Sequence, residues 1–156
     1  MERIHIEAST AYDVIIEDNV LQHITDYIEP LKKPCPTVLV SDDNVAPLYG
    51  SLVKNQLTAA GYTVYEYVFP HGEAEKNASR LIDLVEFMAE KALTRKDLLI
   101  ALGGGVVGDM AGFAAGPPFF RCPIWATWRV LRRPPIYAVS TISKCLHPCW
   151  LRWTPP

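Results

Sequence analysis

The 156-residue sequence lacks the features of a secreted or membrane-embedded chain. Its four cysteines have no regular spacing of a disulfide framework. No window is as long and apolar as a bilayer crossing requires, and the N-terminus does not pair a basic stretch with an apolar run and a cleavage site. We therefore expect a cytoplasmic protein with no membrane partner. A hydrophobic content of 49% is enough for one ordinary core.

The segment after Gly116 lacks both acidic residues and glycine. All 17 acidic residues lie at or before Asp109, so the head carries nine basic residues against 17 acids, a net charge of −8. The tail carries +6, from Arg121, Arg129, Arg132, Arg133, Lys144 and Arg152. Such a difference in charge is found where a basic arm binds nucleic acid or a membrane surface. It is also found where two coding segments of unrelated origin are joined.

The residue types of the tail do not indicate a packed domain. It holds eight of the 13 prolines, all four tryptophans and three of the four cysteines. Proline pairs at 117–118, 134–135 and 155–156 disfavour long helices and central strands. The spacing of Cys122, Cys145, His147 and Cys149 matches no common zinc module. Tryptophan and arginine could mimic a single-stranded nucleic-acid surface, but an unselected GC-rich sequence explains them better. We predict an irregular, poorly ordered tail over 116–156 and no nucleic-acid partner.

Residues 1–115 alternate short apolar runs with amphipathic segments, which predicts an incomplete α/β domain of Rossmann-like type. The expected strands are 4–8 and 14–17, which could pair as a hairpin, followed by 37–41, 62–69 and 98–102. The expected helices are 19–28, a helix through 48–57, 78–92 and 107–115. Gly61 stands where the second helix needs a left-handed residue to end it.

A glycine cluster, Gly103-x-Gly105-x-x-Gly108, follows the apolar run 98–102 and opens the last of these helices. Missing side chains let backbone N–H groups approach a pyrophosphate, and the start of a helix favours an anion. The alternative is a tight strand-to-helix turn without a ligand. No Gly-Lys-Ser/Thr follows, which argues against a P-loop.

Two other predicted strand ends carry polar residues that suit a nucleotide. No acid lies about twenty residues after the glycine cluster to hold a ribose. Asp42, Asp43 and Asn44 follow the strand 37–41 and supply carboxylate and amide acceptors, although Asn44 could equally cap the next helix. Gly72-Glu73-x-x-Lys76 follows the strand 62–69, where the carboxylate can accept from ribose and the ammonium can meet a phosphate or the nicotinamide side. Taken alone, that loop is typical of a solvated helix start.

Through residues 1–115 these segments resemble 3-dehydroquinate synthase, most specifically over 102–115. Residues 40–49 resemble the family's first nucleotide-contact loop and residues 69–76 its second. His71 departs from the acid common in the family before that glycine, which leaves position 71 without an assigned role. The resemblance implies NAD-binding residues at Asp42, Asn44, Gly72, Glu73, Lys76, Gly104, Gly105, Val106, Val107, Gly108 and Asp109.

The resemblance also implies an activity. The family's enzymes are shikimate-pathway lyases that convert the sugar phosphate 3-deoxy-D-arabino-heptulosonate 7-phosphate to 3-dehydroquinate with release of phosphate, using NAD catalytically. A divalent metal, zinc or cobalt, is held by a C-terminal helical domain that this sequence lacks, so we assign it no metal ligand and no catalytic residue and expect no turnover. The family is often homodimeric. The alternatives are an NAD-binding module without chemistry, or a fragment of a related sugar-phosphate cyclase or polyol dehydrogenase.

The genetic code offers a test of the tail. Codons formed from the last base of each codon and the first two bases of the next give glycine at the Trp125–Ala126 junction by necessity. With permitted codons, 125–133 then spells Gly-Asp-Met-Ala-Gly-Phe-Ala-Ala, the sequence already present at 108–115. The shifted frame also permits Leu-Leu-Ala-Ala-Val-Asp-Ser-Ser over 148–156, with the second leucine and the aspartate forced. We infer that a frameshift with local duplication joined the head to an out-of-frame tail.

Overall fold

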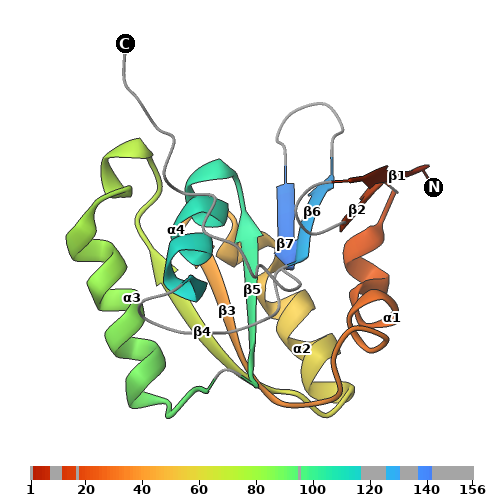
Figure 1. Cartoon of the computed structure of the whole chain (residues 1–156), viewed down its shortest axis with the longest axis horizontal. Helices are drawn as coiled ribbons and strands as arrows, with labels where there is room; N and C mark the ends of the chain where they lie inside the picture. Colours follow the sequence, from red (N-terminus) through yellow and green to blue (C-terminus); the bar gives the residue numbers. More distant parts are fainter. Residues whose placement is uncertain are drawn as a thin grey trace.

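The computed structural model describes residues 2–7, 12–16, 18–94 and 96–116, and the backbone of 126–130 and 137–141. It has an α/β fold in which helices cover both faces of a sheet (Figure 1). The first elements are the strands β1 (Glu2–Ile6) and β2 (Tyr12–Ile16), which pair antiparallel with Ile4 opposite Val14. The expected hairpin is therefore confirmed.

Only part of the predicted helix over 19–28 is α-helical. A 3-10 turn spans Val20–His23, and α1 spans Ile24–Ile28. Asn19 has a left-handed backbone with φ 61°, so the chain enters the segment through a tight turn and not from an extended cap.

The parallel core of the sheet has three strands. β3 (Pro36–Asp42) lies between β4 (Thr63–Phe69) and β5 (Leu98–Gly103) and runs parallel to both. Between β3 and β4 the chain forms a π-helical turn over Ala46–Gly50 and then α2 (Ser51–Ala59). Gly61 follows with φ 91°, which confirms its predicted left-handed role.

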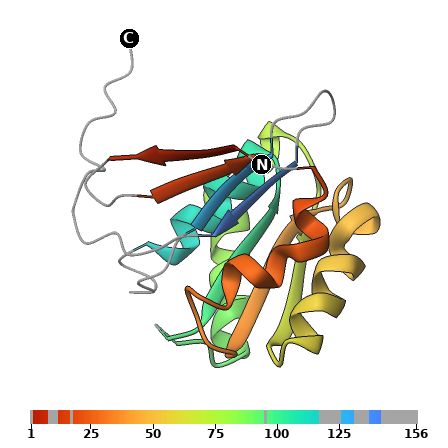
Figure 2. The same ribbon diagram turned by 90° about the vertical axis from the view of Figure 1, so that its right-hand side faces the viewer.

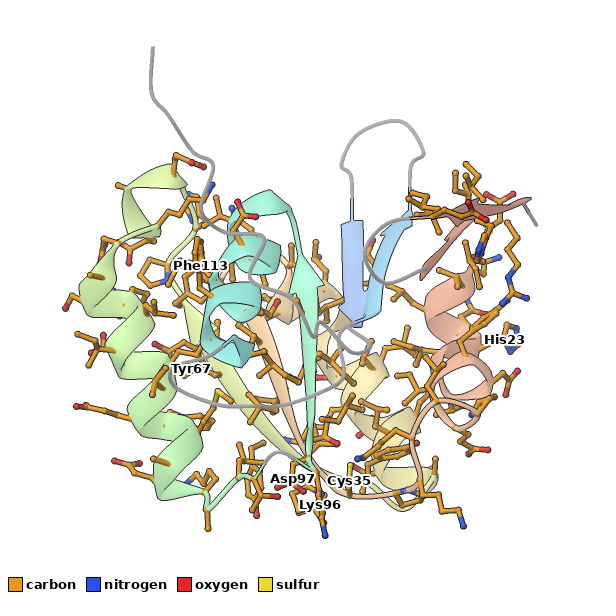
Figure 3. The ribbon with its side chains drawn as sticks, in the orientation of Figure 1. His23, Cys35, Tyr67, Lys96, Asp97 and Phe113 are labelled. Carbon is orange, nitrogen blue, oxygen red and sulfur yellow. The ribbon has the colours of Figure 1, made fainter. Side chains whose placement is uncertain are left out.

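Two further helices lie on the other face (Figure 2). α3 (Ala78–Glu90) connects β4 to β5, and α4 (Gly105–Ala115) follows β5 directly, beginning two residues before the predicted start. Successive strand residues alternate between the two cores. Leu39, Ile100 and Leu102 pack with α1 and α2, whereas Val38, Val40 and Ala101 pack with α3 and α4. Figure 3 shows Tyr67 on the α3 side, where its ring centroid lies 5.3 Å from that of Phe87.

The tail departs from expectation in two places. β7 (Tyr137–Thr141) pairs antiparallel with β5, and β6 (Ala126–Val130) pairs with β7, which gives the strand order β4-β3-β5-β7-β6. The proline pairs disfavour a central strand in the tail, whereas β7 lies between β5 and β6 in the sheet. The prolines at 134–135 fall between the two strands and remove no hydrogen bond within them. No helix in the described part of the chain is both long and apolar enough to cross a bilayer.

Candidate functional site

The polar segments singled out in the sequence meet at one edge of the sheet. Asp42, the last residue of β3, is in register with Phe69, the last residue of β4, and Ser41 is in register with Leu102 near the end of β5. The loops that follow these strands therefore leave the same edge, where open α/β sheets bind ligands. Lys96, Asp97 and Cys35 lie at the opposite edge (Figure 3).

Glycine at position 103 is required by packing. A Cβ at Gly103 would stand 2.6 Å from Cγ2 of Val107, because α4 turns back closely against β5. In the usual dinucleotide pattern the third glycine permits this close packing. Here Gly103, the first glycine of the pattern, has that role.

The other glycines of this turn are not required by packing. A Cβ built at Gly104, Gly105 or Gly108 meets no atom of the described residues within 4 Å, and none of the three has positive φ. The fold alone would accept side chains at all three. Their absence leaves open space beside the start of α4, which is the arrangement that a pyrophosphate needs.

The start of α4 offers backbone N–H groups without a capping side chain. Gly104 is extended at the N-cap and provides no side-chain hydrogen bond, and the N–H of Gly108 donates to the carbonyl of Gly104 at 3.0 Å. Val107 is buried in the core, so it could meet a ligand only through its backbone. Val106 is half-buried, whereas Asp109 is exposed directly after the first turn of the helix.

The loop after β3 is shaped by Asp42. Its Oδ1 accepts from the N–H groups of Asn44 at 3.0 Å and Val45 at 2.8 Å. The next helical turn has Val45 at its N-cap and no side-chain cap, so Asn44 does not cap it. Only one of the two Asp42 carboxylate oxygens takes part in the hydrogen bonds of this loop. The Asn44 side chain is exposed at the same edge.

Lys76 connects the loop after β4 to the glycine turn. Its Nζ lies 2.6 Å from Oδ2 of Asp109 and 3.2 Å from Oε1 of Glu73. The hydrogen bond to Asp109, followed by that to Glu73, raises the pKa of Lys76 above its ordinary value. Three residues predicted to bind NAD are thus in contact. Gly72, in contrast, has φ 111°, so the backbone conformation alone accounts for its glycine.

Two groups of contacts at this edge were missed from the sequence. Asn77 caps α3: its Oδ1 accepts from the Arg80 N–H at 3.0 Å, and its Nδ2 donates to the Ala74 carbonyl at 2.9 Å. The preference for asparagine just before an apolar helical pattern is a signal that could have identified it. Arg80 also binds Glu75 at 2.8 Å.

The second missed contact joins Asp43 to His71, whose Nδ1 lies 2.7 Å from Oδ1 of Asp43. The local sequence pattern does not predict this pair, because the two residues are 28 positions apart. Within the described residues, no three His, Cys, Asp or Glu side chains come together as a metal site.

Solved structures with this architecture include two different synthases. The structure of 2-deoxy-scyllo-inosose synthase is similar with a TM-score of 0.65 and 25% identity, over 76% of this chain and 33% of that protein. ValA, a 2-epi-5-epi-valiolone synthase from Streptomyces hygroscopicus, is similar in fold with a TM-score of 0.60 and 22% identity, over 85% of this chain and 40% of that protein. The fold and its strand-end loops thus define an α/β region of the class found in these synthases.

Sequence relatives narrow the class. Residues 66–121 match the family model described as 3-dehydroquinate synthase N-terminal. The 3-dehydroquinate synthases of Streptococcus gordonii and Lactococcus lactis subsp. cremoris are 44% and 48% identical over 104 residues, which is 67% of this chain and 29% of each relative. The chain is a homologue of the N-terminal region of 3-dehydroquinate synthase. It spans about a third of the length of these relatives.

Proposed function

We propose that this chain provides the NAD-binding region of a 3-dehydroquinate synthase. The observation that carries the proposal is the open space at Gly104, Gly105 and Gly108, three glycines that neither packing nor backbone conformation requires. A related structure of 2-deoxy-scyllo-inosose synthase, 25% identical, contains carbaglucose-6-phosphate, NAD+ and Co2+. The likeness supports NAD as the cofactor and a sugar phosphate as the substrate class.

Each strand end would hold a different part of the cofactor. The N–H groups at the start of α4 would bind the pyrophosphate. The second carboxylate oxygen of Asp42, the Asn44 amide and the Glu73 carboxylate would accept from ribose hydroxyls, and Lys76 would keep its charge beside a phosphate or the nicotinamide. Bound NAD would supply a reversible acceptor for the hydride on a substrate carbon that bears a hydroxyl group.

The overall reaction would convert 3-deoxy-D-arabino-heptulosonate 7-phosphate to 3-dehydroquinate with release of phosphate, in the cytoplasm. The described residues supply no metal cluster, so the zinc or cobalt ligands of this reaction would come from outside them. We propose that a polypeptide of these 156 residues binds NAD without turning over the sugar phosphate. A module that only binds the nucleotide would behave in the same way, whereas measurable turnover would favour a working enzyme.

Calorimetry of NAD binding to the purified chain, paired with a phosphate-release assay, tests the proposal. The decisive variant is Gly108→Ala. Its methyl group enters the open space, so NAD affinity should fall at least about tenfold, a loss of about 1.4 kcal/mol. The same change should raise the free energy of unfolding by about 0.5–1 kcal/mol, because alanine favours a helix interior. Unchanged NAD affinity in this variant, or no NAD binding by the parent chain, would contradict the proposal.

We also propose that the residues from about 116 onward are translated from a shifted reading frame. The family match ends at residue 121, close to the change in composition. Resequencing the locus should reveal the shift before Trp125. Correcting it should yield a chain that continues as a synthase and releases phosphate. A single clean frame through Trp125 would refute this explanation.

A further inference from the structure

Three hydrogen bonds join the ends of β3 and β4. The Asp43 N–H donates to the Phe69 carbonyl at 3.0 Å, and the His71 N–H donates to Asp43 Oδ1 at 2.8 Å. The imidazole Nδ1 of His71 lies 2.7 Å from that same oxygen. One carboxylate oxygen thus accepts from both the backbone and the ring of a single residue. Asp43 Oδ2 takes no part in these contacts.

The chemistry of this contact fixes which ring nitrogen faces the carboxylate. An ionised carboxylate only accepts, so Nδ1 must carry the proton, in the neutral ring or in the imidazolium. The hydrogen bond from the His71 side chain, followed by that from its backbone, holds the pKa of the Asp43 carboxyl below its ordinary value. The carboxylate therefore remains ionised and able to accept across the neutral pH range.

The pair lies between the two loops that carry the proposed ribose-binding groups. Asp43 stands between Asp42 and Asn44, and His71 precedes Gly72 and Glu73. Gly72, with φ 111°, turns the chain directly after the contact. His71 therefore meets Asp43 at the point where the Glu73 loop and the Asp42 loop lie next to each other.

Stability alone gives a weak reason for the pair. Its side chains are 59% and 51% exposed, and exposed ion pairs of this kind contribute little to folding. Their effect should appear instead in a property that depends on the spacing of the two loops. In this part of the molecule, that property is the binding of a ligand held by both.

We propose that His71 is a positioning residue of the cofactor site, holding the Asp42 and Glu73 loops through Asp43 at the spacing that NAD requires. The proposal rests on the proposed function, because it presupposes NAD binding at this edge. In this proposal His71 acts through the hydrogen bond from its Nδ1 to Asp43, and it does not contact the reacting atoms.

Two isosteric substitutions separate the role of Nδ1 from that of the ring as a whole. The amide nitrogen of His71→Asn can take the place of Nδ1 and donate to Asp43, whereas that of His71→Gln reaches the place of Nε2. Calorimetry should give NAD dissociation constants within about twofold of the parent for H71N and about fivefold weaker for H71Q. Asp43→Ala should weaken NAD binding as much as H71Q does. The double variant that combines D43A with H71Q should bind NAD no more weakly than either single variant.

A second measurement is independent of NAD. Carbon-detected NMR titration of the Asp43 carboxyl should show its pKa rising toward the ordinary value in H71Q and staying low in H71N. If the parent binds NAD and H71Q binds it equally well, the positioning role is overturned while the proposed function stands. If the parent does not bind NAD, both fail as statements about the cofactor. An Asp43 pKa unchanged in H71Q would show that the contact itself is absent.

Discussion

In the middle of the sheet, Val38, Val40 and Ile100 are completely buried, whereas at its carboxyl edge Asp43, Glu73 and Asp109 expose half or more of their side chains. The strands supply the first region, and the segments that follow them supply the second. In the interior, packing within the protein accounts for each of these apolar residues, because the side chains fill the space between strands and helices. At the carboxyl edge, the exposed ion pairs and the glycines with open space beside them are not needed to pack the protein. The residues there point to a molecule that the fold itself does not contain.

The border between these regions runs through the glycine turn. Gly103 belongs to the interior, since a Cβ there would stand 2.6 Å from Val107. Gly108 belongs to the edge, since a Cβ there meets none of the atoms that the structure describes within 4 Å. A motif that looks uniform in sequence thus combines a glycine required by packing with glycines that packing does not explain, to which we assign the proposed binding role. Substituting each glycine separately would sharpen this distinction.

The largest effect on stability is expected for Gly103→Ala. The added methyl group would clash with Val107, a buried branched side chain that can retreat only by moving α4 away from β5. Overpacking of this kind costs about 1–3 kcal/mol. Urea denaturation of the purified chain measures the free energy of unfolding.

Gly108→Ala is the matched control for that experiment, because it adds the same atom five residues along the same turn and helix without a clash. The two variants should change stability in opposite directions. If Gly103→Ala unfolded with the parent's free energy, packing would not explain Gly103, and the border would have to be drawn elsewhere.

Much of the interior could be predicted from sequence. The apolar runs at 37–41 and 98–102 predicted β3 and β5 because a strand covered by helices on both faces has no polar side to show. The start of α1 and the strands β6 and β7 were missed. The first depends on the left-handed backbone at Asn19, and the others depend on pairing with β5, which local composition does not encode.

The edge was predictable only in part. Strand ends with polar residues or glycine indicated where a ligand could bind, and the structure brings Lys76, Glu73 and Asp109 together there. The partners themselves were not predictable. Asp43 and His71 meet because β3 and β4 are in a register that ends at Asp42 and Phe69, and a shift of that register would separate them.

A smaller effect is expected at Asn77, whose side chain serves both regions. Its Oδ1 caps α3, which packs on the sheet, and its Nδ2 holds the carbonyl of Ala74 in the loop that carries Lys76. Asn77→Ala should cost about 1 kcal/mol of unfolding free energy through loss of the cap. Asn77→Asp keeps the cap acceptor but has no donor for Ala74. It should therefore unfold like the parent and bind NAD a few-fold more weakly, as measured by denaturation and calorimetry in parallel. Equal NAD affinity in the parent and Asn77→Asp would show that the hydrogen bond to Ala74 does not position the binding loop, and would leave Asn77 with a purely structural role.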